Sequence, residues 1–167
     1  ARMLLADASD LMDAHKYAQA CPLLERATQL VPQGIGAKMV LGECYLGAGR
    51  LASAWEQYSR VEVVALATND ARAAEAHAEL RKLLPRLSKL LFVVPDWMQE
   101  LSGLTIRIGG RALTKEQWES PVNVDTGLHM VEVEAPGLEP WRDTVNIGKN
   151  GTQTVVKVPD LHSSTAE

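Results

Sequence analysis

The side chains that could do acid–base or metal chemistry are scattered along this chain of 167 residues. Its four histidines fall in a predicted turn, a predicted helix, the start of a predicted strand and the polar C-terminal stretch: His15, His77, His129 and His162. No two have the i, i+4 spacing that places both imidazoles on one helical face, and no His-Glu-x-x-His motif occurs. We therefore predict no metal site and interpret these histidines as solvated or turn-positioning side chains.

Loops that would bind a nucleotide or present a nucleophile are missing from the sequence as well. Gly148-Lys149 lacks the earlier glycine of a phosphate-binding loop, and Gly34-Ile35-Gly36 precedes a helix without following a strand. No Gly-x-Ser-x-Gly elbow occurs. The sequence predicts a protein that is not an enzyme and that uses no cofactor.

Two cysteines, Cys21 and Cys44, carry the remaining reactive groups. If neighbouring helices bring their Cα atoms within about 4.4–6.8 Å, the two can form a disulfide, which is typical of an oxidising compartment. The other interpretation is two free thiols buried as small apolar side chains. The sequence leaves both open. A catalytic thiol is disfavoured, because no histidine is evidently paired with either cysteine.

Composition and charge narrow the classes of partner. Charged residues make up 23% of the chain, the net charge is −4, and Lys and Arg form no dense cluster, which argues against nucleic acid or an anionic membrane surface. The longest apolar run, from Leu90 to Pro95, has the length of a strand and not the ~20 residues of a membrane span. We expect no direct membrane insertion by these residues, and any signal peptide or anchor to lie upstream of residue 1.

An abrupt change of composition near Pro85 divides the chain. Ala-, Leu-, Glu- and Arg-rich helical spacing precedes it, and short Val/Ile/Thr runs separated by Gly, Pro, Asn and Asp follow it. Helices and strands segregated in this way predict an α+β protein. We place a helical domain at residues 1–86, a small antiparallel β-sandwich at 87–160 and a flexible polar tail at 161–167.

The helical part repeats with an offset of 34 residues, which pairs Ala8 with Gly42 and Ala20 with Ala54. The second copy reads Leu41-Gly42…Tyr45…Gly49-Arg50-Leu51…Ala54…Tyr58 and resembles the tetratricopeptide repeat, a helix–turn–helix unit of that length. The resemblance covers residues 1–66 and implies antiparallel helical hairpins. A further helix, from about Asp70 to Leu84, is predicted to cap the array, giving about five helices in all.

A groove for a partner follows from this resemblance, because the first helices of stacked tetratricopeptide hairpins line a concave face. The residues that would face it by analogy are Leu5, Ser9, Met12 and Asp13 in the first unit and Met39, Glu43 and Leu46 in the second. Methionines suit adaptable contact, and Asp13 and Glu43 would favour a basic or polar segment. The other interpretation is a plain solvent-facing surface, or one covered by a further helix upstream.

The β part shows a second resemblance, over residues 102–158. Ile106-Arg107-Ile108-Gly109-Gly110 is followed by Gly127-Leu128-His129 and by Val131-Glu132-Val133-Glu134-Ala135-Pro136-Gly137, an order similar to that of PEGA-type domains. Such domains are small sandwiches found mostly in bacterial envelope proteins. The resemblance implies a periplasmic or cell-envelope location.

Aromatic residues in the β part allow a second type of contact surface. Trp97 and Trp118 lie in or beside predicted loops, where they could bind a sugar or a peptide. In small sandwiches such side chains more often close the ends of the core.

The interpretation that these patterns favour is a non-catalytic protein–protein interaction adaptor or scaffold of the bacterial cell envelope, with another protein as its partner. One alternative is a glycan- or cell-wall-binding module that uses the loops of the sandwich. Another is a structural subunit of a larger assembly.

Overall fold

The structure is a computed structural model that describes residues 1–164, and the chain forms two compact units divided between Leu87 and Ser88. The division lies one residue after the boundary expected from composition. Pro85 sits in a single 3₁₀ turn, Leu84–Arg86, where its missing N–H prevents the preceding α-helix from continuing. Leu87 is already extended, with φ −70° and ψ 131°, so the chain leaves the turn in strand conformation.

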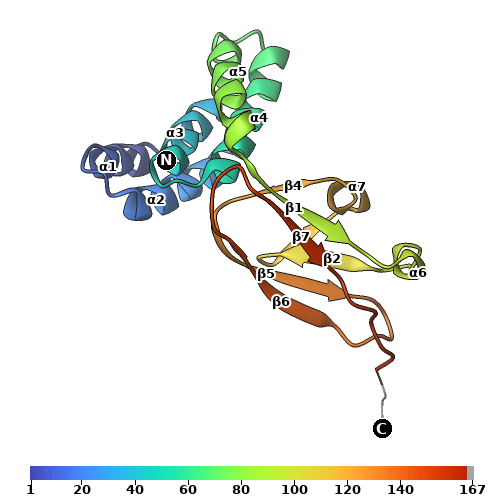
Figure 1. Cartoon of the computed structure of the whole chain (residues 1–167). Coiled ribbons are helices and arrows are strands. Elements are labelled where there is room, and N and C mark those ends of the chain that lie inside the picture. Colours follow the sequence, from blue (N-terminus) through green and yellow to red (C-terminus); the bar gives the residue numbers. More distant parts are fainter. Residues whose placement is uncertain (165–167) are drawn as a thin grey trace. The chain divides into compact units, whose positions relative to one another are not determined.

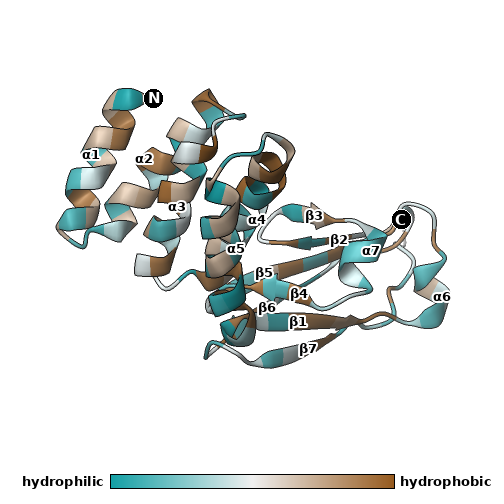
Figure 2. Ribbon diagram, turned by 90° about the horizontal axis from the view of Figure 1, so that it is seen from above, coloured by the Kyte–Doolittle hydropathy of each residue, from teal (hydrophilic) through white to brown (hydrophobic). Residues whose placement is uncertain are grey.

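The first unit consists of helical hairpins, as the 34-residue repeat predicts. Its helices are α1 (Arg2–Asp13), α2 (Tyr17–Leu30), α3 (Ile35–Gly47), α4 (Leu51–Ala67) and α5 (Arg72–Leu83). Each helix packs on the next one in chain order, from α1 to α5 (Figure 1). Apolar and polar residues are interleaved along every helix (Figure 2), which lets each bury one side and expose another.

Three of these helices end in the same hydrogen-bonded turn. The residues with positive φ after α1, α3 and α4 are His15 (56°), Gly49 (75°) and Asn69 (53°). In each case the next backbone N–H donates to the carbonyl five residues earlier over 2.8 Å, as in a Schellman motif. Because His15 and Gly49 occupy equivalent positions of the repeat, the two hairpins share one turn geometry.

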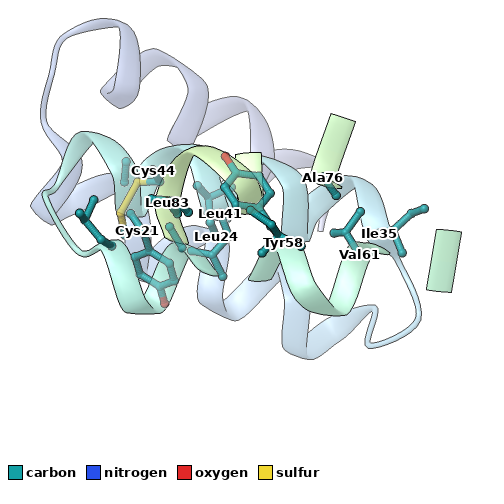
Figure 3. Close-up of a cluster of buried hydrophobic side chains, with 14 of the residues drawn as sticks. Cys21, Leu24, Ile35, Leu41, Cys44, Tyr58, Val61, Ala76 and Leu83 are labelled. Carbon is teal, nitrogen blue, oxygen red and sulfur yellow. A yellow bond between two sulfur atoms is a disulfide. The ribbon is translucent and has the colours of Figure 1, made fainter. Parts of the chain in front are cut away.

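Helices of this unit approach closely where the repeat places small residues. Ala8, Gly42 and Ala76 follow one another at intervals of 34 residues, and all three are buried. A Cβ on Gly42 would lie 2.8 Å and 2.9 Å from ring atoms of Tyr58, so the ring fills the space that glycine leaves. Tyr58 is only 1% exposed and lies deep in the cluster drawn in Figure 3. At the equivalent positions the first hairpin has Ala8 in place of the glycine and Leu24 in place of the tyrosine. The extra methyl group of Ala8 is thus matched by a smaller side chain at position 24.

The last helix, α5, repeats the pattern that the sequence analysis did not find in it. Ala76 is fully buried at the position that Gly42 holds in α3. Like the predicted cap, α5 covers α4, and it buries Leu80 and Leu83. It therefore stands where the first helix of a third hairpin would stand.

The second unit contains two small sheets around one core. One sheet has the order β4–β1–β7, from Val122–Val124, Ser88–Val93 and Gln153–Lys157. The other has the order β3–β2–β5–β6, from Arg111–Leu113, Thr105–Ile108, Gly127–Glu134 and Trp141–Ile147. Two short helices, α6 (Asp96–Gln99) and α7 (Lys115–Trp118), complete the unit. Side chains of strand β5 alternate: Val131 and Val133 are buried, whereas Met130 is exposed.

The prediction of a wholly antiparallel sandwich is wrong for one sheet. Strands β1 and β7 pair in parallel, with Leu90 opposite Thr154 and Phe92 opposite Val156, while the four-stranded sheet is antiparallel throughout. Parallel pairing needs a long crossover, and here the chain between β1 and β7 contains the whole of the other sheet. Alternation along a strand reports which side chains are buried but not the direction of the neighbouring strand.

The start of the predicted flexible tail is anchored in the structure. Leu161 is 7% exposed and belongs to the β core. The N–H of Glu139 donates to the carbonyl of His162 over 2.8 Å, and the N–H of Ser164 donates to the carbonyl of Gly137 over 3.1 Å. One apolar side chain among small polar residues is enough to hold this stretch, which composition alone does not reveal. Residues 165–167 of the predicted tail lie outside the described residues.

The contact between Gly42 and Tyr58 predicts a size limit that stability measurements can test. Gly42→Ala should lower the free energy of unfolding by about 1–2 kcal/mol, because overpacking against the ring outweighs the higher helix propensity of alanine. Combining it with Tyr58→Leu, which copies Ala8 and Leu24 of the first hairpin, should recover part of the loss. The measurement is urea denaturation followed by the helical circular dichroism signal.

Gly36→Ala is the matched control, because a Cβ there would meet only the Arg72 guanidinium at 3.4 Å. This variant should be as stable as the unmodified chain or slightly more stable. Equal stability of Gly42→Ala and Gly36→Ala would contradict the size limit.

Candidate functional site

A cleft of about 470 Å³ opens between α3 and α5 in the helical unit. Its lining residues come from three helices: Met39, Glu43 and Leu46 of α3, Tyr58 of α4, and Glu75, Ala78 and Glu79 of α5. The close approach at the small residues of the repeat brings these helices together. The cleft therefore combines apolar side chains with three carboxylates and one phenol.

Tyr58 contributes an almost completely buried side chain to this cleft. Its ring packs beneath Gly42, and it is 1% exposed. Burial raises the pKa of its hydroxyl, and the negative charges of Glu43 and Glu79 raise that pKa further. The hydroxyl therefore stays neutral at physiological pH and can both donate and accept a hydrogen bond.

The carboxylates of the cleft disfavour one another's charge. Loss of hydration between the helices raises the pKa of Glu43, and the neighbouring charges of Glu79 and then Glu75 raise it further. Glu79 accepts a hydrogen bond from the ammonium of Lys82 over 2.7 Å, one helical turn away. The site is thus electronegative, and only part of this charge is neutralised by the protein itself.

Three of the seven residues predicted to line a groove meet in this cleft. Met39, Glu43 and Leu46 lie there together. The four residues predicted from the first hairpin are on α1: Leu5 and Met12 are half-buried against the helical core, and Ser9 and Asp13 are exposed.

The residues that face α3 across the cleft were not predicted from the sequence. Glu75, Ala78 and Glu79 belong to α5, which was expected to cap the array instead of lining a groove. The recurrence of a small residue at Ala76 is the signal that could have placed this helix in the repeat.

Comparison with protein families agrees with this geometry. Residues 11–80 match the family model described as tetratricopeptide repeat, and the match extends into α5. Residues 11–80 are a tetratricopeptide-repeat segment. No curated protein matches the chain. Tetratricopeptide repeats suggest binding to another protein. A β-rich unit follows this segment in the chain.

The sequence left open whether the two cysteines form a disulfide or remain free thiols, and in the structure they are bonded. Cys21 of α2 and Cys44 of α3 form a disulfide with their Cα atoms 5.7 Å apart, drawn in yellow in Figure 3. It joins the first tetratricopeptide hairpin to the second and is buried. Beside it, the hydroxyl of Tyr45 donates to Glu25 over 2.7 Å, and the Arg50 guanidinium lies 4.4 Å from the centre of the Tyr45 ring. The bond between Tyr45 and Glu25 also connects the hairpins, and so does the ion pair of Arg50 with Glu25 at 3.6 Å.

Of the two tryptophans predicted to form a contact surface on the β unit, Trp97 is exposed and Trp118 is not. Trp118 is 5% exposed and packs in the core, because a capping box of Thr114 and Gln117 folds α7 and turns the ring inward. Trp97 is 48% exposed and donates its indole N–H to Asp160 over 2.6 Å.

Within residues 1–164, no group of three or more His, Cys, Asp or Glu side chains is placed to hold a metal ion. None of the described helices has both the length and the apolar character of a membrane span.

The disulfide predicts a redox-dependent stability of the helical unit. Replacing both cysteines, Cys21→Ala with Cys44→Ala, should lower the free energy of unfolding by about 3 kcal/mol, as expected for a loop closed over 23 residues. The measurement is urea denaturation with and without a thiol reductant. Reductant should destabilise the unmodified protein by a similar amount and leave the double variant unchanged. An unmodified protein insensitive to reductant would contradict the prediction.

The raised pKa of Glu43 predicts that its charge destabilises the fold. The folded state holds the proton of Glu43 more tightly than the unfolded chain does, so its contribution to stability rises as pH falls through the raised pKa. Glu43→Gln should therefore raise the melting temperature at pH 7. The gain should shrink as pH is lowered toward the ordinary value of 4.5, and it vanishes below that value, where Glu43 is neutral in both states. Thermal unfolding followed by circular dichroism measures this difference.

Asp70 acts with the opposite sign and over a lower pH range. Hydrogen bonds from Arg72 lower the pKa of Asp70 to about 2, so its stabilising effect is lost only as pH falls below 3.8. Comparing Glu43→Gln with the unmodified protein at pH 4.5 and above separates the two effects. Asp7→Asn, a charge removal on the exposed surface of α1, is the control and should not reproduce the gain. A melting temperature lowered by Glu43→Gln at pH 7 would contradict the prediction.

Proposed function

We propose that this protein is a non-catalytic adaptor whose tetratricopeptide-repeat segment holds a segment of a partner protein. The observation that carries the proposal is the cleft between α3 and α5, lined by Met39, Leu46 and Ala78 together with polar groups. Apolar walls with a few convergent polar side chains are the usual composition of a binding site. The family match supports a protein as the partner.

The proposal assigns no catalytic residue, because the reactive side chains have local structural partners. Cys21 and Cys44 are joined to each other. His77 pairs with Glu62 over 2.6 Å, and His129 donates to a backbone carbonyl four residues before it over 2.6 Å. These arrangements support a structural role for the side chains that could otherwise act as nucleophiles or bases.

The β unit is proposed as a PEGA-like spacer or docking module. Strand β5 begins at Gly127, with φ 112°, and the ring of His129 bonds to the carbonyl of Asp125 in the preceding turn. Ala135-Pro136-Gly137 follows the end of β5, with Gly137 at φ 77°. These are the positions that carry the resemblance to PEGA-type domains. They give the motif a structural reason here, because each glycine adopts a conformation that other residues rarely take.

A periplasmic or cell-envelope location is part of the proposal. The disulfide between Cys21 and Cys44 supports it, because such bonds persist in oxidising compartments and are rare in reducing ones. A glycan-binding surface has less support, because Trp118 lies in the core and the indole N–H of Trp97 is bonded to Asp160.

Site-specific crosslinking tests the adaptor. A photoreactive amino acid at Ala78, which is exposed and lines the cleft, should crosslink to one defined protein in cells of the source organism. The same amino acid at Gln29, exposed on α2, is the control and should not yield that species. The measurement is recovery of the crosslinked complex and mass spectrometry, after separation of soluble, membrane and cell-wall fractions. Equal crosslinking from both positions, or retention on cell-wall material alone, would contradict the proposal.

A further inference from the structure

The carboxylates of the cleft occupy a costly arrangement. Glu75 and Glu79 are four residues apart on α5, so they share one helical face, and Glu43 approaches them from α3. Like charges at this spacing destabilise a helix. Within residues 1–164, no cation lies within ion-pair distance of Glu43 or Glu75. Arg72, which is bonded to Asp70, interacts with the charge of Glu75 from a greater distance. The only cation bonded to Glu79 in that range is Lys82, whose side chain is 68% exposed. The cleft therefore presents negative charge that a ligand can neutralise.

A second, independent feature of the cleft also indicates a ligand. Tyr58 is only 1% exposed, and its side chain reaches the cleft from α4. Its hydroxyl has no hydrogen-bond partner among the described side chains and backbone groups. Because no fully buried side-chain oxygen or nitrogen of those residues lacks a partner, this hydroxyl is open to the cleft. A phenol held in so little solvent gains free energy when a ligand supplies the missing partner. The hydroxyl and the carboxylates border the same space.

The chemistry of the lining selects the class of ligand. The carboxylates are not placed to hold a metal ion together, so the charge favours a larger, organic cation. Met39, Leu46 and Ala78 offer apolar surface beside the carboxylates. A Lys or Arg side chain has both parts, an apolar stem and a cationic head that donates several hydrogen bonds.

We propose that the cleft between α3 and α5 receives a Lys or Arg side chain of the partner segment. The cationic head lies among Glu43, Glu75 and Glu79 and donates to the Tyr58 hydroxyl. The stem packs on the apolar walls. This inference rests on the proposed function and specifies the partner, a basic segment and not an acidic or purely apolar one.

Peptide titration monitored by NMR tests this assignment. The probes are three hexapeptides with blocked ends, Ala-Leu-X-Ala-Leu-Ala, in which X is lysine, its neutral analogue acetyl-lysine, or glutamate; a fourth has arginine at X. Methyl signals of Met39, Leu46 and Ala78 report binding in the cleft. The lysine or arginine peptide should shift these signals, with an affinity at least about tenfold above that of the acetyl-lysine and glutamate peptides. Added salt should weaken this preference.

Variants of the full chain separate recognition from folding. Glu43→Gln should weaken binding of the basic peptide about tenfold while raising the melting temperature, which damage to the fold cannot do. Tyr58→Phe keeps the ring beneath Gly42 and removes only the hydroxyl, and should weaken binding about fivefold. Asp7→Asn, on the opposite face of α1 from Leu5 and Ser9, should leave the affinity unchanged.

The outcomes that overturn the inference are distinct from those that overturn the adaptor. Equal shifts with the lysine and acetyl-lysine peptides would show an apolar cleft without cation recognition. No shift of the three methyl signals at saturating concentrations of either basic peptide would also overturn the inference. In both cases a defined protein crosslinked at Ala78 would leave the adaptor standing. Absence of that crosslink together with a selective shift by the basic peptide would overturn only the adaptor.

Discussion

Close packing of a glycine against an aromatic ring is the constraint on which the helical unit depends. With no Cβ, Gly42 lets the Tyr58 ring of α4 lie directly against α3. The same position is small in all three first helices, with Ala8 and Ala76 on either side of Gly42 in sequence. Protein interiors are packed as densely as crystals, so a single methyl group at this point would have to displace the ring. The cleft exists because α3 and α5 can both approach α4.

The same packing explains why recognition and stability are opposed in this unit. Bringing α5 toward α3 places Glu75 and Glu79 near Glu43, which raises the pKa of Glu43 and costs stability at neutral pH. The chain supplies stability elsewhere in the same unit. The disulfide between Cys21 and Cys44 joins the hairpins covalently, and the Schellman turns close three of the helices. Functional sites often keep such destabilising charge because the ligand, not the protein, completes the set of interactions.

The β unit depends on a different constraint, the pairing of its first strand, β1, with its last, β7. Strand β1 lies between β4 and β7, and its parallel partner β7 follows all four strands of the other sheet in the chain. Leu161 then adds an apolar anchor beyond β7. The hydroxyl of Ser88 donates to the carbonyl of Lys149 over 2.8 Å, which ties the start of β1 to the turn before β7. Both ends of this unit are therefore fixed by contacts between residues distant in sequence.

The sequence by itself determined the local structure of this protein. Periodicity identified the five helices of the first unit, the 34-residue repeat identified its hairpins, and composition placed the change to strands within one residue of Leu87. Short Val/Ile/Thr runs between turn residues indicated the strands. These features depend on neighbours along the chain, and local spacing reports them well.

Only the tertiary structure decided which distant groups meet. The bond between Cys21 and Cys44, the parallel pairing of β1 with β7, the burial of Trp118 and the approach of α5 to α3 all depend on packing between separate elements. Three of the seven predicted groove residues, Met39, Glu43 and Leu46, are in the cleft, because the repeat assigned them to the correct face of α3. The opposite wall lies on α5 and could not be predicted. A surface helix with two glutamates among alanines, Glu75 and Glu79, has the pattern of a solvated face until another helix is placed against it.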